Sequence, residues 1–176
     1  MVFKQRKVVG IIGSGQQPWS EFSIPLAQWI ARQNYHLLTG GGSGVMTEAA
    51  AAFCQIENRL GICIGIIPTK VNHAGQFIHL DGYPNPWVEL SIVTPLDRLD
   101  SKNQSRISRN YVCVLSSDVI VALAGADGTK NEVNLAISHG KPIILFGSES
   151  AMSDFPQTVA RTTSIEDVKS FIISHK

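Results

Sequence analysis

Charged residues are scarce in this sequence, and neither sign dominates. They make up 16% of the 176 residues, and 15 Lys and Arg against 14 Asp and Glu leave a net charge of +1. A chain whose main partner is nucleic acid or an anionic membrane carries a strong positive field, so we expect neither partner. Hydrophobic residues make up 44%, which is typical of a globular chain. Oligomerisation is expected to cover part of the apolar surface.

Cysteines and long apolar runs are also few. The three cysteines, Cys54, Cys63 and Cys113, contain no CxxC pair, and this usage is typical of reduced, buried thiols in the cytosol. The apolar run at 8–12 is too short for the core of a signal peptide, and no stretch has the length needed to span a bilayer. These absences predict a cytoplasmic protein that is not bound to a membrane.

Common phosphate-binding and metal-binding motifs are missing as well. No GxxxxGK(S/T) occurs, which excludes a P-loop nucleotidase, and Pro18 occupies the place of the third glycine of GxGxxG. A dinucleotide-dependent enzyme is therefore not expected. The five histidines lack the spacing of metal ligands. His73 and His79 could touch a ligand, but they are expected to face water. The sequence predicts no metal site, and it contains no nucleophilic triad.

The sequence does contain an alternation of short β-branched runs with helical patterns, which indicates βαβ units and a parallel sheet. Strands are predicted at 8–12, 35–38, 62–67, 91–93, 119–123 and 142–146. Helices are predicted at 21–33, from the glycine run at 40–44 to 56, at 103–116, at 128–139 and from 164. Residues 69–90 are predicted to form one long loop. We therefore predict a single α/β domain over residues 1–176, with a Rossmann-like, doubly wound, mostly parallel sheet and helices on both faces.

Three glycine-rich segments follow predicted strands. They are Gly13-Ser14-Gly15, Gly40-Gly41-Gly42-Ser43-Gly44 and Gly125-Ala126-Asp127-Gly128-Thr129. In an open parallel sheet such segments share the edge at the carboxyl ends of the strands, where helix N-terminal amides meet a ligand. Each segment alone could equally be a tight turn without a ligand. Three on one edge favour an anion site, because glycine lets an anion approach the backbone.

The predicted helix at 103–116 has a basic face and an apolar face. The basic residues are Lys102, Arg106 and Arg109, and the residues expected in a buried stripe are Ile107, Tyr111, Val114 and Leu115. A basic stripe is more often a solvated face than a binding surface. Its position beside the expected ligand edge keeps contact with a ligand open as the alternative.

Glu132 lies one turn into the helix that follows Gly128 and Thr129. It could simply complement the helix dipole. Alternatively it could accept a hydroxyl of a ligand or act as a base. The sequence leaves both roles open.

Two of the glycine-rich segments resemble motifs of the SLOG superfamily. Residues 40–46, GGGSGVM, resemble GGGxxGxM, and residues 125–132, GADGTKNE, resemble PGGxGTxxE. This superfamily contains the LONELY GUY cytokinin-activating phosphoribohydrolases and the molybdenum cofactor carrier proteins. The resemblance runs from about residue 8 to residue 146.

Departures from the motifs favour the carriers over the enzymes. The phosphoribohydrolases have an arginine-lysine pair before the second motif, whereas this chain has Arg109-Asn110, and Ala124 and Ala126 replace the proline and the second glycine of the motif. Residues 66–68, 91–94 and 115–119 are also similar to the carriers. The resemblance implies a non-catalytic homo-oligomer, a dimer or tetramer, that binds the phosphate-bearing pterin of the molybdenum cofactor, protects it and passes it to molybdenum-dependent enzymes.

The resemblance also implies a set of ligand-binding residues. They are Gly13, Ser14, Gly15, Gly41, Gly42, Gly44, Arg106, Arg109, Asn110, Gly125, Gly128, Thr129 and Glu132. The phosphate is expected at Gly128 and Thr129, with Arg109 or Arg106 neutralising its charge, and Asp127 must turn away or meet a cation. Two alternatives remain. In a nucleoside 5'-monophosphate phosphoribohydrolase, Glu132 would activate water and Arg109 would steady the ribose phosphate, and a nucleotide sensor would bind without turnover.

Overall fold

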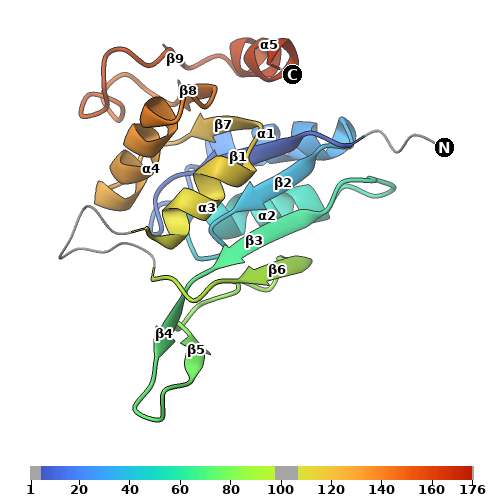
Figure 1. The fold of residues 1–176 in the computed structure, drawn as a ribbon. Helices are drawn as coiled ribbons and strands as arrows, with labels where there is room; N and C mark the ends of the chain where they lie inside the picture. The colour runs from blue at the N-terminus through green and yellow to red at the C-terminus, as the bar shows by residue number, and fades with distance from the viewer. Residues whose placement is uncertain (1–4, 98–106, 176) are drawn as a thin grey trace.

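The computed structural model describes residues 5–97 and 107–175. A seven-stranded sheet with the order β6-β3-β2-β1-β7-β8-β9 forms its centre (Figure 1). Every strand pairing in this sheet is parallel. The strands are β1 (Val8–Ile12), β2 (His36–Thr39), β3 (Cys63–Ile67), β6 (Leu90–Val93), β7 (Val119–Ala122), β8 (Ile143–Phe146) and β9 (Arg161–Thr162). The parallel sheet is confirmed, and only the two-residue β9, too short to carry a pattern, has no counterpart among the predicted strands.

Helices cover both faces of the sheet. They are α1 (Ser20–Arg32), α2 (Val45–Cys54), α3 (Arg109–Ser116), α4 (Asp127–Ser138) and α5 (Ile165–Ser174). Side chains of α1, α2 and α5 belong to one buried apolar cluster, and those of α3 and α4 pack against the other face, as Figure 1 shows for α2 and α3. Successive residues of β7 alternate between the clusters, Val121 in the first and Ile120 in the second, because side chains of a strand point to opposite faces. The predicted doubly wound α/β fold is confirmed.

The direction of winding reverses beside β1. From β1 the chain winds outward through β2 and β3 to β6, and it then crosses back to β7 on the other side of β1. Ligands of open α/β sheets bind where the strand order reverses, beyond the carboxyl ends of the strands. The topology therefore directs attention to the loops that follow β1 and β7.

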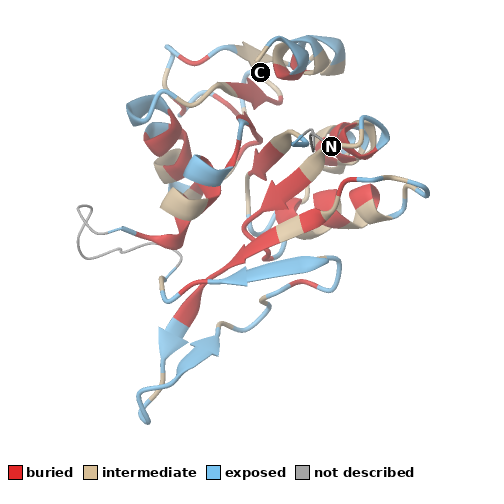
Figure 2. Ribbon diagram, turned by 45° about the vertical axis from the view of Figure 1, so that its right-hand side comes forward, coloured by how far each residue is buried: buried red, intermediate tan, exposed pale blue. Residues whose placement is uncertain are grey.

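The segment 69–90 differs from its prediction. It contains an antiparallel hairpin of β4 (Thr69–Val71) and β5 (Phe77–His79), so the prediction of one long loop is wrong. Asn72 closes the hairpin, since its Oδ1 accepts hydrogen bonds from the amides of Ala74 and Gln76, each at 2.9 Å. The hairpin projects from the sheet and is almost entirely exposed (Figures 1 and 2). Strands of three residues without a buried face leave no alternation to detect.

Helix α3 also departs from the sequence prediction. It begins at Arg109 rather than at residue 103, and residues 107 and 108 precede it without helical structure. Lys102 and Arg106 lie outside the described residues. The predicted buried stripe is wrong at Ile107 and Leu115, which are 67% and 48% exposed, and right at Val114. The face that packs against the sheet instead carries Arg109, Asn110, Cys113 and Val114, because its polar members line a cavity at the sheet edge.

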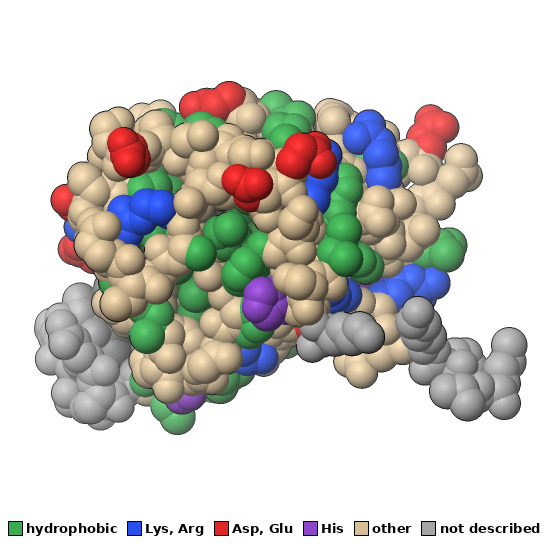
Figure 3. Space-filling model, turned by 90° about the horizontal axis from the view of Figure 1, so that it is seen from above, with side chains coloured by type: hydrophobic (Ala, Val, Ile, Leu, Met, Phe, Trp, Pro, Cys, Tyr) green, Lys and Arg blue, Asp and Glu red, His purple; other side chains and the backbone are tan. Residues whose placement is uncertain are grey.

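Among the described helices, none combines the length and apolar character that crossing a membrane requires. On the face seen in Figure 3, acidic and basic side chains are scattered among one another, and neither sign forms a patch.

Candidate functional site

A cavity of about 470 Å³ opens beyond the carboxyl ends of β1 and β7, and its volume lies in the usual range of small-ligand pockets. Seven of the residues singled out in the sequence line it: Gly13, Gly15, Arg109, Asn110, Gly128, Thr129 and Glu132. These residues come from the loop after β1, from the start of α3 and from the first two turns of α4. The fold therefore brings together residues from segments that lie more than a hundred positions apart.

Ser14 does not line this cavity but holds its loops together. Its amide donates to Ala124 O at 3.0 Å, and its own carbonyl accepts from the amide of Val45 at 2.9 Å. Its hydroxyl accepts from the amides of Gln16 and Gln17 at 3.1 and 3.0 Å. The backbone of Ser14 is thus committed to linking the loop after β1 with the loop after β7 and with the start of α2.

Gly41, Gly42, Gly44 and Gly125 also lie behind the cavity wall. Gly44 has φ +63°, and a Cβ there would overlap the carbonyl oxygen of Ser14, so this position needs glycine for both conformation and space. A Cβ at Gly125 would overlap the hydroxyl of Thr129. These glycines allow the loops to approach one another closely. Arg106, the remaining predicted residue, lies outside the part of the chain that the structure describes.

Arg109 is the central cation of the site. Its side chain is buried, with the residue 5% exposed, and Nη1 lies 3.7 Å from Oε1 of Glu132 and donates to Sγ of Cys113 at 3.3 Å. A Cβ at Gly40 would overlap this Nη1. The first glycine of the GGG run therefore provides the space that the guanidinium occupies. The interpretation of the basic residues as a solvated face is wrong for Arg109.

The guanidinium of Arg109 retains a free donor. Its Nε is buried and has no hydrogen-bond partner among residues 5–97 and 107–175. Buried N–H groups are almost always paired in folded proteins, because leaving one unpaired costs about 1–3 kcal/mol. A guanidinium is suited to hold an anion, because its N–H groups form charge-assisted hydrogen bonds.

Glu132 shares this buried environment. Burial raises the pKa of its carboxyl to about 7, and the positive charge of Arg109 limits the rise. Burial likewise raises the pKa of the Cys113 thiol to about 11, so that this thiol is protonated at neutral pH. The carboxyl of Glu132 is therefore balanced between its two protonation states near neutral pH, next to a permanent cation.

Asn110 and the start of α4 line one side of the cavity. Nδ2 of Asn110 donates to Oδ1 of Asn131 at 3.2 Å and lies 3.5 Å from the carbonyl oxygen of Gly128, which links α3 to α4. A Cβ at Gly128 would meet no atom within 4 Å, so this helix start faces open space. Asp127, the first residue of α4, is exposed and does not line the cavity.

The structure adds Tyr83 and Asp97, which the sequence patterns do not identify. Tyr83 packs against Gly42, and both residues line the cavity together with Gly40, Met46 and Ala126 of the two glycine-rich motifs. Asn85 is buried and fixes the same loop, because its amide donates to Gly41 O at 2.7 Å and its Nδ2 to Gly42 O at 2.9 Å. Tyr83 is one of three aromatic residues, with Phe77 and Trp87, in the segment 69–90. Nothing local marks Asn85.

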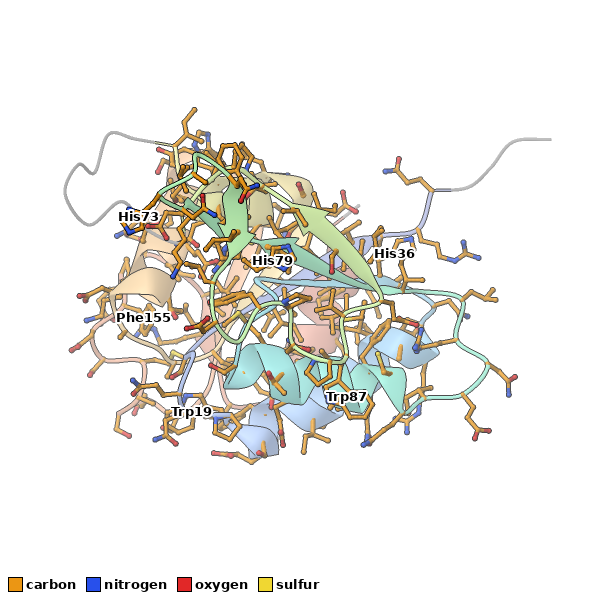
Figure 4. All side chains as sticks on the ribbon, turned by 90° about the horizontal axis from the view of Figure 1, so that it is seen from below. Trp19, His36, His73, His79, Trp87 and Phe155 are labelled. Atoms are coloured by element: carbon orange, nitrogen blue, oxygen red, sulfur yellow. The ribbon has the colours of Figure 1, made fainter. Side chains whose placement is uncertain are left out.

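Histidines and metal ligands do not gather at the site. His73 lies in the turn of the β4–β5 hairpin and His79 is the last residue of β5, whereas His36 is the first residue of β2 and lies away from both (Figure 4). Both hairpin histidines are exposed, as predicted. In the portion of the chain that the structure covers, no group of three or more His, Cys, Asp or Glu residues is arranged to hold a metal ion.

Comparisons with known proteins agree with this architecture. The model of the SLOG cluster4 family matches residues 6–172. The structure of the molybdenum cofactor binding protein from the phototrophic bacterium Rippkaea orientalis is 30% identical, with a TM-score of 0.71 over 97% of this chain and 99% of that one. The molybdenum cofactor carrier protein of Chlamydomonas reinhardtii is 26% identical, with a TM-score of 0.66 over 96% and 99%. DNA processing protein A from Helicobacter pylori, 17% identical with a TM-score of 0.65 over 95% and 80%, shares the fold alone.

Proposed function

This chain belongs to the SLOG cluster4 family, and we propose that it is a carrier that binds the molybdenum cofactor, protects it and passes it to molybdenum-dependent enzymes. The observation that carries the proposal is the buried guanidinium of Arg109, whose Nε has no partner among the described residues and which lines the cavity beside the open start of α4. A phosphate placed between this guanidinium and the amides of Gly128 and Thr129 receives a charge-assisted hydrogen bond and a favourable helix dipole. The similarity to cofactor-binding proteins over nearly the whole chain supports the identity of the cargo.

The rest of the cavity suits the pterin part of the cargo. Tyr83 and Met46 line the cavity on the side of the loop after β2, and they offer an aromatic face and a polarizable thioether to a planar ring. Gly13 and Gly15 line it without side chains that would compete for space. The cargo would thus lie with its phosphate at α4 and its ring toward the glycine loops.

Retention of the cofactor tests this proposal. The purified full chain is incubated with molybdenum cofactor, passed through a desalting column, and the retained pterin is measured by fluorescence after oxidation. We expect Arg109→Gln and Thr129→Val to reduce retention at least tenfold. Arg32→Gln, which alters an exposed arginine on α1, is the matched control and should retain the wild-type amount. Retention no better than that of an unrelated Rossmann-like protein would contradict the proposal.

One observation favours a second function, the hydrolysis of nucleoside 5'-monophosphates. A carboxyl whose pKa is about 7 is well suited to act as a general base at neutral pH, and Glu132 and Arg109 line one cavity. Against this stands Asn110, which replaces the lysine of the phosphoribohydrolase motif. Release of free base from AMP, abolished by Glu132→Gln, would establish the enzyme. A nucleotide sensor would instead bind AMP tightly without releasing base and would not retain the pterin.

We also infer that the carrier is a cytoplasmic single-domain protein that forms a homo-oligomer. The edge strand β6 exposes Leu90, Ile92 and Val93 by 44%, 42% and 51%, and the neighbouring hairpin exposes Phe77 by 58%. Apolar edges of this kind are usually covered by a partner. Sedimentation of Ile92→Glu should show a smaller species than wild type, whereas Ile173→Glu, at an exposed position on α5, should not. Equal sedimentation of Ile92→Glu and wild type would contradict this surface.

A further inference from the structure

Arg109 and Glu132 are two buried groups of opposite charge that share one cavity. Nη1 of Arg109 lies 3.7 Å from Oε1 of Glu132, a separation longer than that of a hydrogen bond. Within residues 5–97 and 107–175, no group donates a hydrogen bond to the Glu132 carboxyl. The ionised form of Glu132 is thus stabilised by one charge at a distance, without the hydrogen bonds that a buried carboxylate usually has.

The other groups around Glu132 add no second positive charge among the described residues. The titratable groups on the elements packed against it are Arg109 and Cys113 on α3 and Tyr83 and Asp97 on the segments before and after β6. Burial raises the pKa of the Cys113 thiol to about 11, so this thiol is neutral. On α4 itself, Lys130 pairs with Asp154 at 3.1 Å and is not part of the cavity lining. Of the described residues that line the cavity, Arg109 is therefore the one cation.

An anion that binds in this cavity competes with Glu132 for the charge of Arg109. Glu132 follows Thr129 by three residues on α4, so the two buried side chains share one face of the helix and line the cavity together. A dianion held by Arg109 and the start of α4 would add two negative charges beside an ionised Glu132, where burial weakens screening by water. A proton on Glu132 removes one of these charges, and it gives the carboxyl an O–H that can donate to the anion.

We propose that the cavity binds its anion together with one proton, which Glu132 takes up from the solvent, and that the protonated carboxyl donates a hydrogen bond to the ligand. The inference rests on the proposed function in one respect, namely that the ligand is a phosphate-bearing anion held by Arg109. A carboxyl kept neutral by its surroundings is an effective hydrogen-bond donor at neutral pH. Burial raises the pKa of Glu132 to about 7, which supports the proposal because the proton is then held at little cost near neutral pH.

This role of Glu132 is opposite to its role in the hydrolase alternative. A general base must be ionised while its substrate is bound, because it accepts a proton from the attacking water. In the carrier, Glu132 is protonated in the complex and has a proton to donate instead. The protonation state of Glu132 in the bound state therefore distinguishes a binding site from a catalytic one.

The pH dependence of sulfate binding tests the proposal. Sulfate is the probe because it has the shape of phosphate and keeps both charges between about pH 6 and pH 9, whereas a phosphate ester changes its own charge around pH 6. The full chain is dialysed to equilibrium against radioactive sulfate, and the dissociation constant is measured at each pH. We expect binding to weaken roughly tenfold per pH unit above about pH 7, because the free protein has then lost the proton that binding must restore.

Variants assign this proton to Glu132. Glu132→Gln keeps an N–H donor and has no proton to lose, so its affinity should not change with pH and should exceed that of wild type at about pH 9. Arg109→Gln should not bind sulfate detectably. Glu149→Gln, at an exposed position after β8, is the matched control and should keep the wild-type dependence. Absence of sulfate binding by wild type, a wild-type affinity independent of pH, or a dependence that persists in Glu132→Gln would overturn the proposal.

Infrared difference spectroscopy detects the proton directly in the wild-type protein. Addition of sulfate at about pH 8 should replace the bands of a carboxylate by the C=O band of a protonated carboxyl, and Glu132→Gln should show no such change. Absence of this band in wild type would overturn the proposal.

The outcomes also separate this inference from the proposed cargo. Sulfate binding with the expected pH dependence, but without retention of pterin, would refute the carrier and support proton uptake by Glu132. Retention of pterin together with sulfate binding that is independent of pH would support the carrier and refute proton uptake.

Discussion

The side chain of Arg109 fills the space that a side chain at position 40 would need. The guanidinium Nη1 lies where a Cβ of residue 40 would be, so the glycine run after β2 and the first residue of α3 depend on each other. The run of three glycines thus serves the placement of a cation as well as the shape of a turn. This relationship gives the first of four predictions.

Gly40→Ala should destabilise the protein, because the new methyl group displaces a buried guanidinium. Overpacking of this kind costs about 1–3 kcal/mol of the free energy of unfolding, measured by urea denaturation. Gly128→Ala is the matched control for stability, since a Cβ there meets nothing within 4 Å. It should leave stability equal or raise it by up to ~1 kcal/mol, because alanine favours the helix. Equal urea midpoints for wild type and Gly40→Ala would show that the Arg109 side chain moves aside without lowering the free energy of unfolding.

The stability of the protein should depend on pH through Glu132. Its pKa is about 7 in the folded chain and near the ordinary value of 4.5 in the unfolded chain. Between these pH values the unfolded chain releases the proton while the folded chain keeps it, so stability falls as pH rises. Below the lower value both states are protonated and the effect vanishes. The full loss above about pH 7 is roughly 3 kcal/mol.

Glu132→Gln isolates this dependence. The glutamine has no proton to release, so the stability difference between wild type and the variant should shift in favour of the variant between about pH 5 and pH 8. Denaturation of both proteins at each pH gives the difference, and titrations elsewhere in the chain cancel. A difference that does not change with pH would mean that the folded carboxyl titrates at its ordinary value.

Asn85→Ala should release the loop that covers the glycine run. The change removes the bonds from Nδ2 to Gly42 O and from the Trp87 amide to Oδ1. Gly42 O keeps its bond from the Thr47 hydroxyl, whereas the Trp87 amide loses its side-chain partner. We expect a loss of about 2 kcal/mol in urea denaturation. The exposed Asn134 provides the control, because Asn134→Ala should stay within about 0.5 kcal/mol of wild type. Similar effects of the two variants would refute the anchoring role of Asn85.

Thr162→Val should weaken the start of α5. Its hydroxyl donates to Oδ2 of Asp167 at 2.7 Å and accepts from the amide of Ser164 at 2.9 Å, while Ser164 Oγ accepts from the Asp167 amide at 3.4 Å. Valine has the same shape without the hydroxyl, and its cost should be about 1 kcal/mol by thermal denaturation. The exposed neighbour is the comparison, since Thr163→Val should have no measurable effect. If the two variants have the same melting temperature, the hydrogen bonds of the Thr162 hydroxyl contribute nothing to the stability of the protein.

The start of α5 shows how much of a helix start can be predicted from the local sequence. Ser164 and Asp167 have the sequence spacing of a capping box, and the Ser164 side chain accepts a hydrogen bond from the Asp167 amide. In the usual box the second residue is a longer side chain that reaches the backbone N–H of the cap. Here the Asp167 carboxylate meets the hydroxyl of Thr162, which in turn receives the Ser164 amide. The pattern therefore identifies the helix start, while its full set of partners depends on the strand before it.

The parallel sheet was predictable because its strands are short, continuous apolar runs separated by helices, and a strand buried on both faces has no other composition. The burial of Arg109 was not, since helical periodicity assigns a charged residue to the solvent unless a counter-charge and a space are known. Both come from distant parts of the chain, Glu132 from α4 and Gly40 from the loop after β2. The sequence places the glycine segments at the carboxyl edge of the sheet. It does not tell which glycines line the cavity and which only let the loops pack closely, because that depends on the contacts of Ser14 and Thr129 in the folded chain.

Because the strand order reverses beside β1, residues that are synthesised at different times meet in the cavity. The first half of the chain supplies Gly13, Gly15 and Tyr83 to the cavity, and the second half supplies Arg109 and Glu132. A nascent chain emerges from the ribosome from its N-terminus, so the cavity has no cation until α3 has been synthesised and no complete wall until α4 has followed. The complete cavity is therefore a property of the finished protein, and any ligand that needs both halves of its lining binds only after translation.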